Sequence, residues 1–292
     1  MCTTCGCSDG ATTTVINPAT GEHSHVMPDG TVVTHSHDHA HGQAHSHDHD
    51  HDHAHDHDHD HAHDHGHSHS HDHGHSHGVE TLEAQVLAKN DTLAARNREW
   101  FSAHRQTALN LMSSPGAGKT TLLVRTLADR EGKAWVIEGD QESTLDADRI
   151  QATGAPVVQV NTGTGCHLEA DMVWEGLNQL GPPDGSVIFV ENVGNLVCPA
   201  LFDLGETAKV VLFSTTEGED KPTKYPHMFR AADLVLLTKV DLVPHLDFDV
   251  DRALAAVKEL NPDAPILQVS AKTGEGMDAW HAWIEGCRTI PV

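Results

Sequence analysis

Ser113-Ser114-Pro115-Gly116-Ala117-Gly118-Lys119-Thr120-Thr121 follows an apolar run and opens a helical one. This is the setting that a phosphate-binding loop requires. Its glycines let backbone N–H groups approach phosphate oxygens, and the helix N-terminus adds partial positive charge. We expect Lys119 to reach the β- and γ-phosphates and Thr120 to bind Mg²⁺. A serine stands at position 113, where glycine is usual. The residues assigned to the phosphates are Gly116, Ala117, Gly118, Lys119, Thr120 and Thr121.

Around this loop, short apolar segments rich in β-branched residues alternate with segments of helical pattern. This alternation predicts an α/β fold with a mainly parallel sheet flanked by helices on both faces. Ligands of such sheets bind beyond the carboxyl ends of the strands, where every motif described below falls. Strands are expected at 108–112, 134–137, 157–160, 187–190, 210–213, 234–237 and 266–269. Helices are expected at 119–130, 144–152, 167–180, 248–260 and 276–287.

Two later elements predict a guanine nucleotide. A Thr-Lys-x-Asp element at 238–241, with threonine where asparagine is commoner, and a Ser-Ala-Lys element at 270–272 both stand at strand ends. The Asp241 carboxylate can accept hydrogen bonds from the ring N–H and the exocyclic amine of guanine, and adenine offers neither in that geometry. We therefore expect GTP and GDP as ligands. The residues assigned to the base are Thr238, Lys239, Asp241, Ser270, Ala271 and Lys272.

Two acidic segments follow expected strands, namely 138–140 and 191–194. Either can hold Mg²⁺ or orient the attacking water. We favour Asp140 for Mg²⁺ and Glu191 beside the γ-phosphate, which Gly194 can sense through its N–H. Since no glutamine is obviously placed to orient water, we expect a GTPase with slow intrinsic turnover and switch-like behaviour. The predicted catalytic residues are Lys119, Thr120, Asp140 and Glu191.

Two cysteine groups have the character of metal sites. Cys2, Cys5 and Cys7, with the terminal amine, supply three sulfurs and one nitrogen, a set that suits both square-planar Ni²⁺ and tetrahedral Zn²⁺. Cys166-His167 needs a third ligand from elsewhere, and Cys198 is the natural candidate. Three ligands leave a position for water or for a second subunit. The alternative is that Cys166 and Cys198 are buried apolar residues, as we expect for Cys287 on its helical pattern.

The N-terminal region differs in composition from the rest of the chain. Residues 1–79 contain no lysine or arginine, and His23 to His77 include all but five of the 28 histidines, many alternating with aspartate. This run lacks apolar periodicity, so we expect a disordered metal-binding tail rather than a packed unit. A purification tag fits poorly, because tags are uniform histidine blocks, and an inert solvated spacer is the remaining alternative. The predicted domains are 1–9 (cysteine motif), 10–79 (tail) and 80–292 (nucleotide-binding domain with a leading helix, 80–104).

Charge and hydropathy exclude two classes of partner. The net charge of −25 leaves no basic patch for nucleic acid. No run of about 18 apolar residues predicts a membrane span, and no signal peptide is recognisable, so the cytoplasm is the expected compartment.

Five stretches together resemble the HypB family of nickel-incorporation GTPases, which serve [NiFe]-hydrogenase maturation. They are Met-Cys-Thr-Thr-Cys-Gly-Cys (1–7), the histidine-rich tail, the phosphate-binding loop, Thr-Gly-Thr-Gly-Cys-His-Leu-Glu-Ala-Asp (162–171) and Val-Glu-Asn-Val-Gly-Asn-Leu-Val-Cys-Pro (190–199). The resemblance covers essentially the whole chain, and the tail is its least specific part. It implies a phosphate-binding-loop NTPase fold of the SIMIBI type.

The resemblance also implies a homodimer in which Cys166, His167 and Cys198 lie at the subunit interface, and a tighter nickel site at Cys2, Cys5 and Cys7. The implied partners are a zinc-bearing HypA-type accessory protein and the hydrogenase large subunit. Two alternatives stay open. One is a urease-type nickel GTPase, which the cysteine cluster and Cys166-His167 argue against. The other is a nickel storage protein, which the intact nucleotide motifs argue against for the chain as a whole.

Overall fold

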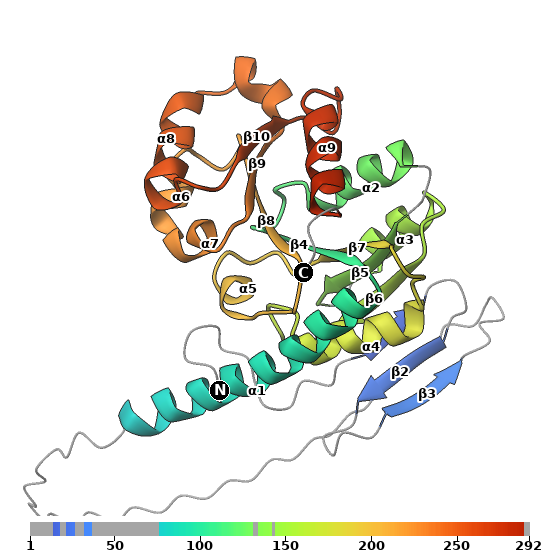
Figure 1. The fold of residues 1–292 in the computed structure, drawn as a ribbon. Helices are drawn as coiled ribbons and strands as arrows, with labels where there is room; N and C mark the ends of the chain where they lie inside the picture. Colours follow the sequence, from blue (N-terminus) through green and yellow to red (C-terminus); the bar gives the residue numbers. More distant parts are fainter. Residues whose placement is uncertain are drawn as a thin grey trace, which may run out of the picture.

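A computed structural model describes residues 14–17, 22–26, 32–36, 76–130, 134–141 and 144–288. The described strands form one sheet in the order β10-β9-β8-β4-β7-β5-β6-β1-β2-β3, whose first seven members are parallel (Figure 1). The predicted mainly parallel sheet is therefore confirmed. The parallel strands are β4 (Thr107–Ser113), β5 (Trp135–Asp140), β6 (Val157–Asn161), β7 (Val187–Glu191), β8 (Ala208–Ser214), β9 (Leu234–Thr238) and β10 (Ile266–Val269).

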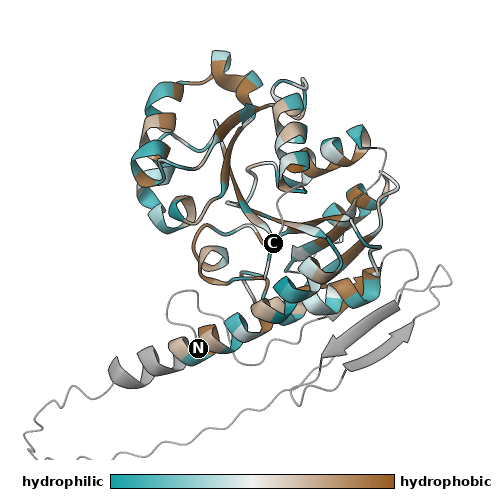
Figure 2. Cartoon of the chain, viewed as in Figure 1, coloured by the Kyte–Doolittle hydropathy of each residue, from teal (hydrophilic) through white to brown (hydrophobic). Residues whose placement is uncertain are grey.

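Helices cover both faces of the parallel strands. Leu109 and Leu111 of β4 pack with α2, α3 and α9, whereas Met112 packs with α7 and α8 on the opposite face. The strands are accordingly the most hydrophobic part of the chain in Figure 2, because they are buried on both sides. The helices are α1 (Ser76–Ala103), α2 (Lys119–Asp129), α3 (Leu145–Gln151), α4 (Ala170–Leu180), α5 (Cys198–Leu201), α6 (Lys221–Lys224), α7 (Pro226–Arg230), α8 (Val250–Leu260), α9 (Met277–Cys287) and the 3₁₀ helix η1 (Val240–His245).

Three boundaries differ from the predicted ones by three or more residues. β5 continues to Asp140, so Glu138 and Asp140 lie on the strand itself rather than in a loop after it. α4 begins at Ala170, so Cys166 and His167 lie in the loop before it and do not begin the helix. The reason is a turn in which Gly165 N donates to Thr162 O (2.8 Å), which delays the helix. α1 begins at Ser76, four residues before the predicted start.

The prediction of disorder over the whole of 10–79 is wrong for three strands and for the first four residues of α1. β1 (Thr14–Asn17), β2 (Glu22–Val26) and β3 (Val32–Ser36) pair antiparallel, and β1 also pairs antiparallel with β6. The physical reason is that β-branched residues meet the open edge of β6, where Val15 becomes fully buried. Cys2, Cys5, Cys7 and most of the histidine run lie outside the described residues.

The described helices were also searched for membrane spans. Within this part of the chain, none combines the length and the apolar character needed to cross a bilayer.

Candidate nucleotide and metal site

The phosphate-binding loop leaves β4 and enters α2 in a conformation that its glycines permit. Gly116 (φ +76°) and Gly118 (φ +100°) adopt backbone angles that favour glycine. Lys119 Nζ donates to Ser113 Oγ (2.9 Å), so the serine at the unusual position holds the lysine. Burial lowers the pKa of the Lys119 ammonium, and the charges of Glu191 and other carboxylates oppose this shift. The lysine is therefore a buried cation placed for an anionic ligand.

Two buried carboxylates face this loop from neighbouring strands. Glu138 of β5 and Glu191 of β7 are register partners, and Thr120 Oγ1 donates to Glu191 Oε1 (2.7 Å). One oxygen of each, Oε2 in both cases, is buried without a hydrogen-bond partner. Burial and the charge of Glu191 raise the pKa of Glu138 to about 9, and burial raises that of Glu191 to about 7. A divalent cation would offset the negative charge of both carboxylates and bind their unpartnered oxygens, since hard cations take oxygen ligands. These residues therefore fit Mg²⁺.

Glu138 lies in the predicted acidic segment 138–140 but was not predicted as a magnesium ligand. Asp140, preferred there for Mg²⁺, lies two residues further along β5, where its Oδ1 accepts from Gln141 N (2.8 Å). The signal available was the period of two along a strand, which places positions 138 and 140 on the same face. The predicted strand ends at 137, whereas β5 continues to Asp140 and includes both positions.

Replacing Glu138 with glutamine should stabilise the nucleotide- and metal-free protein at high pH. The folded pKa of Glu138 (about 9) lies above its ordinary value of 4.5, so its stabilising contribution is complete below pH 4.5 and is lost as pH rises towards 9. We expect Glu138→Gln to raise the free energy of unfolding by on the order of 2 kcal/mol at pH 8, and by much less at pH 5.5. Urea unfolding at both pH values measures this. The exposed Glu259→Gln is the control, and an equal effect of Glu138→Gln at both pH values would contradict the argument.

The two elements predicted to recognise the base and the phosphate-binding loop line one pocket of about 290 Å³. Ser270 Oγ donates to Asp241 Oδ1 (2.7 Å), which orients the carboxylate. Thr238 Oγ1 donates to Ala117 O (2.7 Å), which gives the threonine at the asparagine position a structural role. Lys239 Nζ donates to Gly116 O (2.7 Å). The pocket is lined by Ala117, Gly118, Thr121, Leu122, Thr238, Lys239, Asp241, Leu242, Val269, Ser270, Ala271 and Lys272.

The three predicted interfacial metal ligands also lie together. The ligand atoms of Cys166, His167 and Cys198 are all within 4.8 Å of one another, and the two sulfurs are 3.0 Å apart. That separation exceeds a disulfide bond of about 2.05 Å, so both cysteines are thiols. Burial lowers the pKa of His167 to about 4, which keeps the imidazole neutral and able to ligate. Cys287, by contrast, is buried on α9, and burial raises the pKa of its thiol to about 11.

One segment, 191–198, joins the two sites. Glu191 contacts Thr120, and Asn192 Oδ1 accepts from Leu168 N (3.0 Å), next to His167. Gly194 lies so close to the phosphate-binding loop that a Cβ there would be 3.0 Å from Pro115 Cα. The segment ends at Cys198, one of the three candidate metal ligands. Few residues therefore separate the phosphate-binding loop from the candidate metal site.

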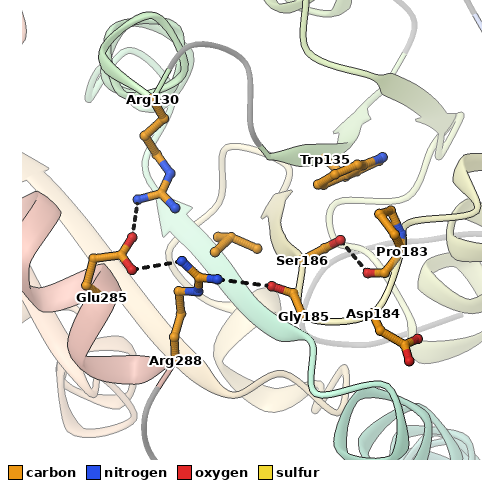
Figure 3. Close-up of a pocket in the computed structure, with 9 residues that line it drawn as sticks. Arg130, Trp135, Pro183, Asp184, Gly185, Ser186, Glu285 and Arg288 are labelled. Carbon is orange, nitrogen blue, oxygen red and sulfur yellow. Dashed lines mark hydrogen bonds and ion pairs between the residues drawn. The ribbon is translucent and has the colours of Figure 1, made fainter.

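A second pocket, of about 450 Å³, lies at the other ends of the strands, where β5 and β7 begin. Figure 3 shows that Arg130 and Arg288 both donate hydrogen bonds to the Glu285 carboxylate, with Trp135 opposite. It contains none of the predicted site residues. Its position at the amino ends sets it apart from the ligand-binding edge of a parallel sheet.

Comparison with known proteins identifies the family of this chain. Residues 107–268 match the family described as "CobW/HypB/UreG, nucleotide-binding domain". The hydrogenase maturation factor HypB of Azotobacter chroococcum mcd 1 is 59% identical over 206 residues, covering 70% of this chain and 68% of that protein. A crystal structure of HypB from Helicobacter pylori in complex with nickel is 40% identical, with a TM-score of 0.65, and covers 68% of this chain and 95% of that one. The chain therefore belongs to the HypB family of hydrogenase maturation factors.

Proposed function

We propose that this chain is a GTP-hydrolysing metallochaperone that delivers nickel to the large subunit of a [NiFe]-hydrogenase. The observation that carries the proposal is the 191–198 segment, which connects a nucleotide loop to a site of two thiols and one imidazole. The relative solved with nickel, HypB from Helicobacter pylori, supports nickel as the cargo. Zn²⁺ suits the same ligands and is the alternative occupant at rest.

In this mechanism the nucleotide controls the metal ligands. Lys119 holds the β- and γ-phosphates, and Asp241 selects guanine. Thr120, Glu138 and Glu191, with Asp140 beside them, would hold Mg²⁺, which would neutralise the negative charge of the phosphates. Loss of the γ-phosphate allows Gly194 to move relative to Pro115, and Cys198 moves with Gly194. Gln141 donates to Gly165 O (3.3 Å) instead of lying free to orient water, which supports slow intrinsic turnover.

Four further parts of the proposal concern assembly, cargo and transfer. Two apolar side chains beside Cys198, Val197 and Leu201, are 37% and 46% exposed, which supports a homodimer that completes the metal site. We assign a tighter nickel site to Cys2, Cys5 and Cys7, and nickel storage to the tail between His23 and His77. A HypA-type accessory protein is the proposed partner in transfer.

A second target is also supported. A relative named "Hydrogenase/urease maturation factor HypB", from Helicobacter pylori, is 40% identical over 199 residues and is covered by this chain over 82% of its length. Urease maturation is therefore the alternative delivery route.

Complementation of a strain lacking this chain tests the proposal. The full chain should restore hydrogenase activity at limiting nickel, and the double variant Cys166→Ser, Cys198→Ser should not. A chain lacking residues 23–77 should fail only when nickel is scarce, because the tail stores metal but does not time its release. Both enzyme activities are measured with and without added nickel. Full hydrogenase activity from the cysteine variant at limiting nickel would contradict the proposal, and restored urease activity would identify the second target.

A further inference from the structure

Two asparagines of α1, Asn90 and Asn97, are buried although both carry polar amides. They are 2% and 0% exposed, and their spacing of seven residues places them on one side of the helix. That side lies against α4, and the two helices run side by side in Figure 1. A buried amide costs free energy unless its hydrogen bonds are made, so the partners of these two amides are informative.

Each asparagine joins the segment after His167 to the segment after Cys198. Asn90 Oδ1 accepts from Ala170 N (2.9 Å), and its Nδ2 donates to Asp203 O (2.7 Å). Asn97 Nδ2 donates to both Ala170 O (2.7 Å) and Leu204 O (3.0 Å). The two amides therefore hold the same pair of segments together at two levels along the helix.

The two segments that the asparagines contact follow the candidate metal ligands His167 and Cys198 closely in the chain. Ala170 lies three residues after His167, and the ring of Phe202, just before Asp203, lies 3.9 Å from the His167 ring between centroids. The second segment packs closely against α1, because a Cβ added at Gly205 would be 2.4 Å from Ala94 O. Both segments therefore connect α1 to His167 through few residues.

We propose that Asn90 and Asn97 are positioning residues that set the placement of Cys166 and His167 relative to Cys198. This inference rests on the metal site proposed above and adds that its ligand geometry is determined from outside the site, by α1. The amides touch no ligand atom. They act by fixing the backbone on both sides of the gap that the metal spans.

Thiolate-to-nickel absorption in the full-length chain tests this role. Cys2, Cys5 and Cys7 are replaced by serine, so that the absorption arises from Cys166 and Cys198, and Ni²⁺ alone is titrated. Asn97→Leu is compared with Gln106→Leu. Gln106 is a matched control because it is 2% exposed and its Nε2 donates to two backbone carbonyls, Pro182 O (2.8 Å) and Pro183 O (3.3 Å), away from the metal ligands.

We expect Asn97→Leu to weaken nickel binding at this site about tenfold and to shift the absorption band, since supporting residues of metal sites commonly matter to this extent. Gln106→Leu should lower thermal stability comparably and leave the band and the affinity unchanged. Equal losses of affinity in the two variants would overturn the inference. If Asn97→Leu does not fold, Asn90→Ala replaces it, and an unaltered affinity there would also overturn it. Absence of the band before either asparagine is changed would instead refute the metal site itself, and this inference with it.

Discussion

Lys119→Ala will reduce the rate of GTP hydrolysis by about a hundredfold or more, the usual consequence of removing a charge placed where transition-state charge develops. The structure makes this loss severe, because Lys119 is the buried cation of the loop and Ser113 Oγ holds its ammonium in place. Alanine would also leave Glu138 and Glu191 without the cation that offsets their charges. Hydrolysis is measured as phosphate release at saturating GTP.

Two controls make this result specific. The first control is Lys258→Ala. Lys258 is also held by hydrogen bonds, which its ammonium donates to Pro262 O (2.9 Å) and Ala264 O (2.8 Å). This variant should hydrolyse GTP normally. Nickel binding by the histidine run should survive in Lys119→Ala, because the two features are separate in sequence. Unchanged turnover in Lys119→Ala would refute the assignment of residues 113–121 to the phosphates.

The architecture could be predicted from the sequence because it rests on local patterns. Each parallel strand is a short apolar run buried on both faces, and most helices between the strands have a recognisable apolar period, so their order alone implies a parallel sheet. The phosphate-binding loop and the base elements are contiguous motifs. Their meeting in one pocket follows from the position of all strand carboxyl ends at one edge of the sheet.

The remaining features depend on contacts between distant segments. A period of two can place Glu138 on one face of a strand, but its register with Glu191 is set by the folded sheet. The edge strands β1 to β3 form because β6 offers an open edge, a property of the folded sheet rather than of residues 14–36. Asn90 and Asn97 would read as ordinary polar positions of a helix, and only the fold reveals the backbone groups that they join.

Asp241→Asn should convert the nucleotide preference from guanine to xanthine. Asp241 lines the base pocket, and Ser270 Oγ donates to its Oδ1, so the carboxylate is held in one orientation. With Oδ1 still held by Ser270, asparagine would place its N–H₂ group where the second carboxylate oxygen stood. That group opposes the exocyclic amine of guanine, donor against donor, but can donate to the carbonyl that xanthine carries at the same ring position.

We expect kcat/KM for GTP to fall about a thousandfold in Asp241→Asn, because a site built to pair polar groups rejects a ligand that leaves them unpaired. Hydrolysis of XTP should rise above that of GTP, with the rate at saturation near the original one, since Lys119, Thr120 and Glu191 are untouched. Competition between the two nucleotides measures the change. Asp251→Asn, at an exposed acid of α8, should keep the guanine preference. Retained GTP selectivity in Asp241→Asn would show that another group reads the base, and the pocket beside Lys239 would then need a different ligand assignment.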